Sequence, residues 1–212
     1  MPDTTRSSTI NNTLRKIESL ARHDDKVEVD FDETKLLLPH HEFIECSPIK
    51  QRDLMIVALS YEAGLKRSEL KHLNTDQVIQ YDDNTLSLSI DSVSIPLSPE
   101  LGALLLTYLG TLQDTTVLFP SFDNKKQITS NRMNDSTIYR ASKRILTDVL
   151  GLPNETHHFA RKSFARDMYR SGMSIQDVSD AGRWKSLAMP SEYNNLQSIS
   201  CEAFKKHKKN QA

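Results

Sequence analysis

The sequence predicts a mainly α-helical domain with a small antiparallel β-sheet, an α+β fold. After about residue 50, apolar residues recur every three or four positions, which is the spacing of one face of a helix. Between Val78 and Leu97 the spacing changes to every second residue, which is typical of strands with one buried face. With 212 residues, 37% of them hydrophobic, the chain is long enough for one domain with a sizeable core.

The N-terminal region is predicted to be an extension and not a domain. Residues 1–15 are rich in Ser, Thr and Asn, which is typical of a tail. A short helix is predicted at Asn12–Arg22, followed by an acidic, irregular segment at His23–Glu33. We therefore expect residues 1–45 to form a short extension that lacks a complete domain of its own.

The helices and strands that follow are predicted from the spacing of apolar residues and from the Gly and Pro residues that mark their ends. Helices are expected at Arg52–Ala63, Ser68–Leu73, Pro99–Leu109, Ser130–Leu150, His158–Ser171 and Ser174–Ala181. Gly64 is well placed to end the first of these helices. In the segment of alternating residues, Leu86, Leu88 and Ile90 alternate with serines, so we expect a β-hairpin that turns at Asp91-Ser92.

Composition excludes several classes of protein. The longest apolar runs span only a few residues, so the sequence predicts no transmembrane helix and no membrane partner. Residues 1–13 are polar, so they do not resemble a secretory signal. Two cysteines, Cys46 and Cys201, suit a reducing compartment and exclude a disulfide scaffold. We expect a cytoplasmic protein associated with the nucleoid.

Charge is unevenly distributed along a chain whose net charge is only −1. Residues 1–49 carry six Lys/Arg against ten Asp/Glu, whereas residues 150–212 carry ten against six. A basic C-terminal third is compatible with an anionic partner, since phosphate binding depends on local charge. On charge alone, however, an ordinary solvated surface is the favoured interpretation.

Four local features stand in one order along the chain. They are Gly64-Leu65-Lys66-Arg67-Ser68-Glu69-Leu70, the hairpin, His158-Phe159-Ala160-Arg161, and Gly182-Arg183-Trp184 followed nine residues later by Tyr193. Together with Leu118-Phe119-Pro120-Ser121, they resemble the catalytic domain of the tyrosine recombinases, or phage integrase family. The resemblance extends from about Asp53 to Leu196.

The resemblance implies a chemistry that needs no metal and no cofactor. In this family a tyrosine hydroxyl, here Tyr193, attacks a DNA phosphodiester and becomes joined to the 3′ phosphate. Arg161 and Lys66 would hold the scissile phosphate. His158 would transfer a proton or donate a hydrogen bond to the phosphate, and the indole N–H of Trp184 would donate another. Taken singly, His158 and Arg161 could be a surface pair and Trp184 a core anchor, but the joint pattern favours the site.

The same resemblance implies double-stranded DNA as the partner. Basic residues beside the motifs are then expected to contact DNA, namely Arg67, Arg132, Lys162 and Lys185. We expect residues 46–196 to form the catalytic domain and residues 197–212 to form a basic tail. Self-association on DNA as a tetrameric synapse is expected, and an accessory DNA-binding protein is compatible with the short N-terminal extension.

Two departures from the family pattern keep an alternative function open. The first basic position is normally arginine, and Lys66 keeps the charge but loses the bidentate geometry. The family usually has a lysine on the hairpin, yet no lysine or arginine lies between Lys71 and Lys125. The leading prediction is a site-specific recombinase. The alternatives are a DNA-binding or assembly protein that keeps the fold without the chemistry and, more distantly, a type IB topoisomerase-like enzyme.

Overall fold

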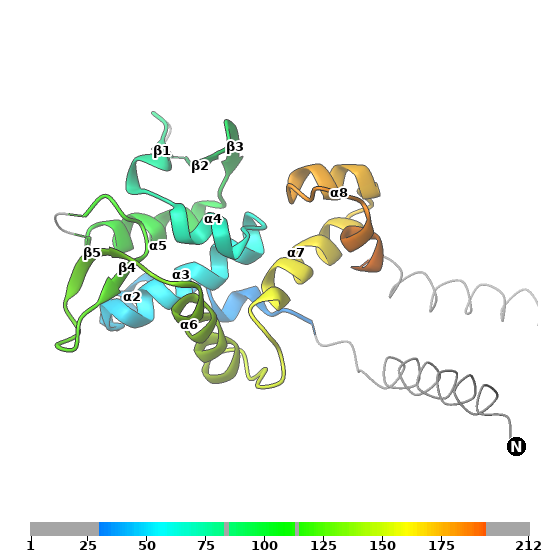
Figure 1. Ribbon diagram of the computed structural model, residues 1–212. Coiled ribbons are helices and arrows are strands. Elements are labelled where there is room, and N and C mark those ends of the chain that lie inside the picture. Colours follow the sequence, from blue (N-terminus) through cyan, green and yellow to red (C-terminus); the bar gives the residue numbers. More distant parts are fainter. Residues whose placement is uncertain (1–29, 83–84, 113–114, 194–212) are drawn as a thin grey trace, which may run out of the picture. The chain divides into compact units, whose positions relative to one another are not determined.

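A computed structural model describes residues 30–82, 85–112 and 115–193, and the compact unit that they form begins at Phe31 (Figure 1). The helices are α2 (His40–Glu45), α3 (Pro48–Glu62), α4 (Arg67–His72), α5 (Pro99–Leu109), α6 (Asp135–Asp148), α7 (His158–Arg170) and α8 (Ile175–Ala181), with 3₁₀ turns η1 (Glu33–Lys35) and η2 (Thr75–Gln77). The strands are β1 (Val78–Gln80), β2 (Leu86–Ile90), β3 (Val93–Pro96), β4 (Pro120–Phe122) and β5 (Ile128–Arg132). The fold is thus mainly helical with little β-structure, which confirms the predicted fold class.

Helix α3 forms the centre of the core. It begins with Ser47, whose hydroxyl accepts from the Lys50 N–H at 3.3 Å, and with a proline at the first helical position. Residues 51–60 are all buried, because α5, α6 and α7 pack around this helix. Its buried carboxylate, Asp53, accepts from the guanidinium groups of Arg52 and Arg144, so the charge is compensated.

The predicted hairpin is confirmed. Strands β1, β2 and β3 form an antiparallel sheet in that order, and β2 pairs with β3 from Ser87–Pro96 to Ile90–Val93. Asp91 and Ser92 both have positive φ angles, as a tight two-residue hairpin turn requires. The apolar residues of β2 are buried against the core, so the alternating pattern had identified the inward face correctly.

The predicted start of the helix at Ser130 is wrong. The segment expected to be helical from Ser130 begins as strand β5, which pairs with β4 in a second, two-stranded sheet. Helix α6 starts only at Asp135, because the Asn134 side chain accepts from the Thr137 N–H at 2.8 Å and caps the helix there.

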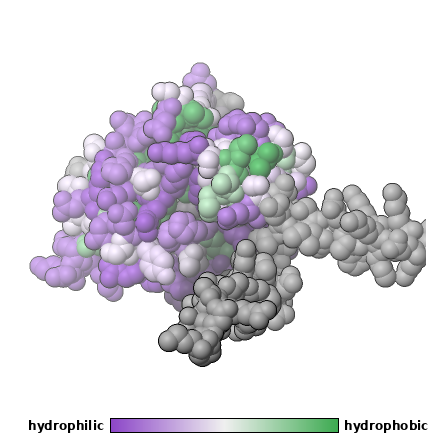
Figure 2. Space-filling model, turned by 45° about the vertical axis from the view of Figure 1, so that its right-hand side comes forward, coloured by the Kyte–Doolittle hydropathy of each residue, from purple (hydrophilic) through white to green (hydrophobic). Residues whose placement is uncertain are grey.

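The N-terminal part of the described chain also contributes to the core. Leu36 and Phe43 are almost fully buried in the same apolar cluster as α3, so the packed unit starts before residue 46. The face shown in Figure 2 is mainly hydrophilic, interrupted by a small hydrophobic patch. None of the helices in the described ranges has the length and apolar composition needed to cross a bilayer. The predicted helix at Asn12–Arg22 and the basic tail at 197–212 lie outside the described residues.

Candidate active site

The loop that leaves α3 passes directly against α7. Gly64 has a φ of +57°, and a Cβ at this position would lie 2.7 Å from the ring of Phe164 on α7. A glycine is therefore needed both for the backbone conformation and for the close approach. The loop delivers Lys66 to the start of α4, where its backbone N–H donates to Glu69 Oε2 at 2.7 Å.

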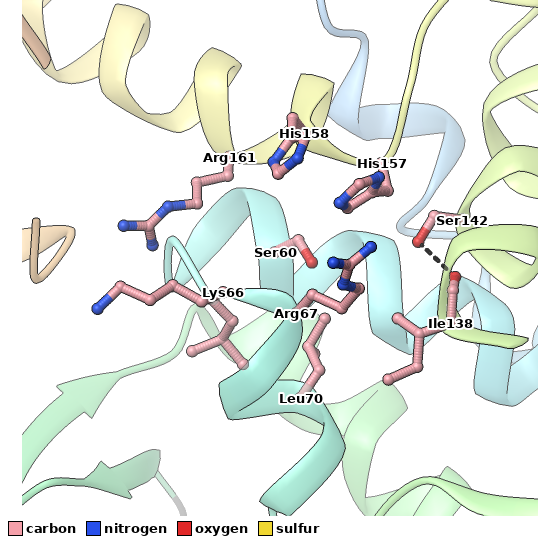
Figure 3. A pocket seen from close by; sticks show the side chains of 10 residues that line it. Ser60, Lys66, Arg67, Leu70, Ile138, Ser142, His157, His158 and Arg161 are labelled. Atoms are coloured by element: carbon pink, nitrogen blue, oxygen red, sulfur yellow. Dashed lines mark hydrogen bonds between the residues drawn. The ribbon is translucent and has the colours of Figure 1, made fainter. Parts of the chain in front are cut away.

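A small cavity of about 90 Å³ opens between this loop, α6 and the first turn of α7 (Figure 3). It is lined by Ser60, Leu65, Lys66, Arg67, Leu70, Ile138, Ser142, His157, His158 and Arg161. Among these described lining residues five are basic and none is acidic. In Figure 3 the side chains of Lys66 and Arg161 extend in the same direction from opposite elements, whereas Arg67 reaches toward the histidines. The arrangement suits an anion of modest size.

Arg161 is held rigidly at the edge of this cavity. Its side chain is buried, and its guanidinium donates to the carbonyl oxygens of Gly64 and Gly182. The guanidinium carbon lies 4.0 Å from the ring centroid of Trp184, a cation–π contact. Burial lowers the pKa of Arg161 to about 10, which still leaves the group charged at neutral pH. Arg161 is therefore a fixed, partly desolvated cation.

Trp184 and Tyr193 lie beside Arg161. The Trp184 ring occupies the space in which a Cβ of residue 182 would stand, so Gly182 is required for this position. The rings of Trp184 and Tyr193 meet edge to face, with centroids 6.2 Å apart. Burial raises the pKa of the Tyr193 phenol, the Arg161 charge opposes that shift, and Glu192 adds to it. The phenol is thus protonated at neutral pH and next to a cation.

Two adjacent histidines begin α7. The ring centroids of His157 and His158 are 3.8 Å apart, and Tyr139 meets His157 edge to face. Burial lowers the pKa of His158, and the charges of Arg67 and Arg161 lower it further. Burial also lowers the pKa of His157, to about 4. Both imidazoles are therefore neutral at pH 7, and a neutral imidazole can accept a proton.

The structure brings the five sequence-predicted catalytic residues into one region. Lys66, His158 and Arg161 line the cavity, while Trp184 contacts both Arg161 and Tyr193. The roles assigned to them stay predictions.

The four basic residues predicted to contact DNA lie in different surroundings. Arg67 is exposed and lies 3.5 Å from Asp135. Arg132 donates to the backbone carbonyls of Lys71 and Leu73, so it ties β5 to the end of α4. Lys162 is half-buried on α7, and Lys185 is exposed just after Trp184. That these residues contact DNA stays a prediction, and for Arg132 much of the donor capacity is already used within the protein.

Sequence reasoning missed three residues of this region: His157, Glu69 and Arg183. His157 lines the cavity, and its only sequence signal was its position beside His158. Glu69 is nearly buried and accepts from Arg183, Nε to Oε1 and Nη2 to Oε2, both at 3.0 Å. The contact joins residues 114 positions apart in the chain, so no local pattern could have revealed it.

The hairpin tip lies near the same region. A second hollow, of about 240 Å³, lies between α4 and the tip, and its lining includes Glu69, His72 and Asp91. The tip thus presents a carboxylate near α4, and β2 and β3 carry no lysine or arginine.

The depressed pKa of His157 leads to a pH-dependent stability. In the unfolded chain the group has a pKa near 6.5, whereas in the fold it has a pKa of about 4, so unfolding takes up a proton between these values. The contribution of the neutral, buried ring to stability is complete above pH 6.5 and declines as the pH falls toward 4. We expect His157→Gln to reduce this acid-side loss of stability, measured as the urea midpoint at a series of pH values.

The matched control is His41→Gln on the exposed face of α2. It should keep the wild-type pH dependence of the urea midpoint. If His157→Gln kept the wild-type pH dependence of the urea midpoint, burial of the His157 ring would not be the cause of the loss of stability at acid pH.

Comparison with known proteins identifies the fold. The sequence profile of the phage integrase family matches residues 28–198. In the structural comparison the chain is similar to XerA recombinase, with a TM-score of 0.60, 23% identity, and coverage of 86% of this chain and 64% of that one. It is also similar to XerH site-specific recombinase in a post-cleavage complex with a palindromic difH substrate, with a TM-score of 0.58, 18% identity, and coverage of 84% and 53%.

A further similar structure is a lambda integrase (75–356) dimer bound to a COC′ core site, with a TM-score of 0.50, 18% identity, and coverage of 82% of this chain and 62% of that one. The chain therefore spans between about half and two thirds of the length of these recombinases. No curated protein sequence matches the chain. At these identities the structural similarity shows the fold, a tyrosine recombinase catalytic domain.

Proposed function

Because this chain belongs to the phage integrase family, we propose that it is a site-specific DNA recombinase that breaks and rejoins DNA through Tyr193. The observation that carries the proposal is the convergence of a buried, charged arginine, Arg161, with a cation-lined cavity and a tyrosine. A phosphodiester is the anion in DNA that such a site would bind. The similar XerH and lambda integrase structures are complexes with DNA.

In the proposed reaction the Tyr193 oxygen attacks the phosphorus of one DNA strand. A bond forms between the phenolic oxygen and phosphorus, and the bond from phosphorus to the 5′ oxygen breaks. The phenol gives up its proton, for which neutral His158 is a suitable acceptor, and the departing 5′ oxygen takes a proton from water. Attack of the freed 5′ hydroxyl on the phosphotyrosine reverses the step and rejoins DNA.

The cations act on the charge that this reaction builds. As the pentavalent transition state forms, negative charge accumulates on the two non-bridging oxygens. Arg161 can offer N–H donors from a fixed position, because two carbonyls already orient its guanidinium. Lys66 supplies a second positive charge, and the Trp184 indole supplies an N–H donor. Their pre-set geometry avoids reorganisation during the reaction.

The proposal extends to the whole assembly. The predicted range 46–196, together with the packed segment before it that contributes Leu36 and Phe43 to the core, serves as the catalytic domain, and duplex DNA in the nucleoid is the substrate. Recombination between two sites needs several active sites, so the protein self-associates on DNA as a tetramer. An accessory DNA-binding protein would help to hold the complex.

One observation favours a second function, that of a DNA-binding or assembly protein without chemistry. Within the described strands of the hairpin no lysine is present to protonate the leaving 5′ oxygen, and Asp91 stands at the tip. Lys66 also gives a less directional phosphate contact than arginine would. Both features weaken cleavage without weakening the general attraction to DNA.

Two measurements on the same duplex separate these functions. DNA affinity is measured against salt, and we expect a steep fall, with a slope of about −0.9 for each phosphate contacted. The protein is then incubated with nicked candidate sites and probed for a complex that survives denaturation. A covalent complex supports the recombinase, whereas salt-dependent binding without one supports the assembly protein. Affinity that does not depend on salt would contradict both.

A further inference from the structure

Arg183 is a nearly buried cation that has no part in the reaction described above. Its side chain is 11% exposed, and its φ is +56°, a left-handed conformation uncommon for arginine. The guanidinium donates through Nη2 to the carbonyl oxygens of Ala63 and Gly64, both at 3.2 Å, and through Nη1 to that of Ala181 at 2.8 Å. With the bidentate pair to Glu69, these contacts engage all three nitrogens of the guanidinium.

The carboxylate of Glu69 is shared between Arg183 and Lys66. Glu69 Oε1 lies 3.0 Å from Arg183 Nε and 3.4 Å from Lys66 Nζ. The Glu69 side chain is 10% exposed, so its charge is poorly screened by water. Burial alone would raise the pKa of Glu69, but hydrogen bonds and charge from Arg183, together with those of Lys66, outweigh burial and lower it. The carboxylate is thus ionised, and Arg183 and Lys66 compete for its negative charge.

Arg183 also touches the residue that positions Arg161. The carbonyl of Gly64 accepts from both Arg161 and Arg183, and the carbonyl of Gly182, next to Arg183 in the chain, accepts from Arg161. The segment around Gly182 and the loop after α3 are therefore held together by two arginines that share one acceptor.

We propose that Arg183 is a positioning residue that neutralises most of the charge of Glu69, so that the Lys66 ammonium, paired with Glu69 at 3.4 Å in this structure, can leave the carboxylate for a DNA phosphate. This inference rests on the proposed function, because it assigns Lys66 to the scissile phosphate. A lysine is a point charge on a flexible stem, so a competing carboxylate at 3.4 Å can hold it away from its target. Arg183 satisfies both oxygens of that carboxylate with the better-matched guanidinium.

The test is a double-mutant cycle that compares wild type with Arg183→Gln, Glu69→Gln and the double variant. Gln at position 183 keeps N–H donors for the carbonyls but removes the charge, and Gln at position 69 keeps an acceptor for the Lys66 N–H. We expect Arg183→Gln to slow covalent cleavage by about tenfold to a hundredfold, since a displaced contact at a reacting centre has effects of this size. In the double variant the carboxylate charge is gone, so cleavage should recover most of this loss.

A second readout does not depend on cleavage. If Glu69 captures Lys66 in Arg183→Gln, one phosphate contact is lost, and the slope of log affinity against log salt should become less steep by about 0.9. The double variant should restore the wild-type slope. Loss of Arg183 could also destabilise the fold by leaving the Glu69 carboxylate unpaired, and the double variant would relieve that as well. A salt slope that changes in Arg183→Gln at a temperature where the variant is fully folded separates the two effects.

Arg144→Gln is the matched control. Arg144 also donates to a buried carboxylate, from both Nε and Nη2 to Asp53 Oδ2, but it lies on α6 and does not line the cavity. Arg144→Gln should lower the melting temperature and leave the salt slope unchanged. Circular dichroism of all variants shows whether each is folded.

Each outcome is decisive. Equal cleavage and equal salt slopes in Arg183→Gln and the double variant would overturn the inference, as would an Arg183→Gln protein that behaves like wild type. If wild type binds DNA but forms no adduct, the proposed chemistry fails, and the salt slopes alone then decide the inference. If wild type does not bind DNA, both are overturned.

Discussion

Tyr193→Phe should form no covalent adduct with DNA, while its DNA affinity stays within about twofold of wild type. The substitution removes only the hydroxyl oxygen, which is the atom that would bond to phosphorus. The aromatic contact with Trp184, at 6.2 Å between centroids, is retained. The measurement is the fraction of labelled DNA that stays with the protein under denaturing conditions.

Tyr81→Phe is the control for this prediction, because it removes a hydroxyl from an exposed tyrosine just after β1. It should leave the adduct at wild-type level. An adduct that persists in Tyr193→Phe would mean that another nucleophile is used.

Arg161→Ala should lower adduct formation by about a hundredfold to a thousandfold, since it removes a fixed hydrogen-bond donor from the charged phosphate oxygens.

A substrate with sulfur in place of the bridging 5′ oxygen should give the largest gain in cleavage. The thiol is far more acidic than the alcohol, so the leaving group departs without a proton donor. If the lysine-free hairpin limits the reaction, wild type should cleave this substrate much faster than normal DNA. The rate of adduct formation on the two substrates is compared at one pH.

Lys66→Arg shows which feature limits the rate of cleavage, the weaker phosphate contact of Lys66 or the missing proton donor for the leaving 5′ oxygen. If loss of the bidentate contact is the limit, Lys66→Arg should accelerate cleavage of normal DNA, tenfold for about every 1.4 kcal/mol regained. If the leaving group is the limit, Lys66→Arg should change little and the sulfur substrate should still be cleaved quickly. Failure of both changes to raise cleavage, with DNA bound, would favour the assembly protein.

Periodicity predicted most of the fold, because long amphipathic segments and alternating strands carry their signal locally. Helix α5 was predicted at Pro99–Leu109, as observed, since it has a Ser cap, an early Pro and a continuous apolar face. The sheet of β4 and β5 was missed because its strands are short and their register is irregular. Helix α2 was missed because it is a short helix in which only Phe43 is buried.

The candidate site could be predicted only where chemistry and local spacing coincide. The His158–Arg161 spacing and the interval from Trp184 to Tyr193 are local, and these residues do come together in the structure. The electrostatic support is not local: Arg183 meets Glu69 across most of the chain, and the neutrality of His157 results from burial. Such contacts form only when α3, α4, α7 and α8 are packed.

The most direct test is to identify the residue that is linked to DNA. The sulfur substrate is incubated with wild-type protein, the adduct is digested, and the nucleotide-bearing peptide is sequenced by mass spectrometry. The account predicts one modified residue, Tyr193, joined to a 3′ phosphate. A nucleotide on any other residue, or bound DNA with no adduct at all, would contradict it.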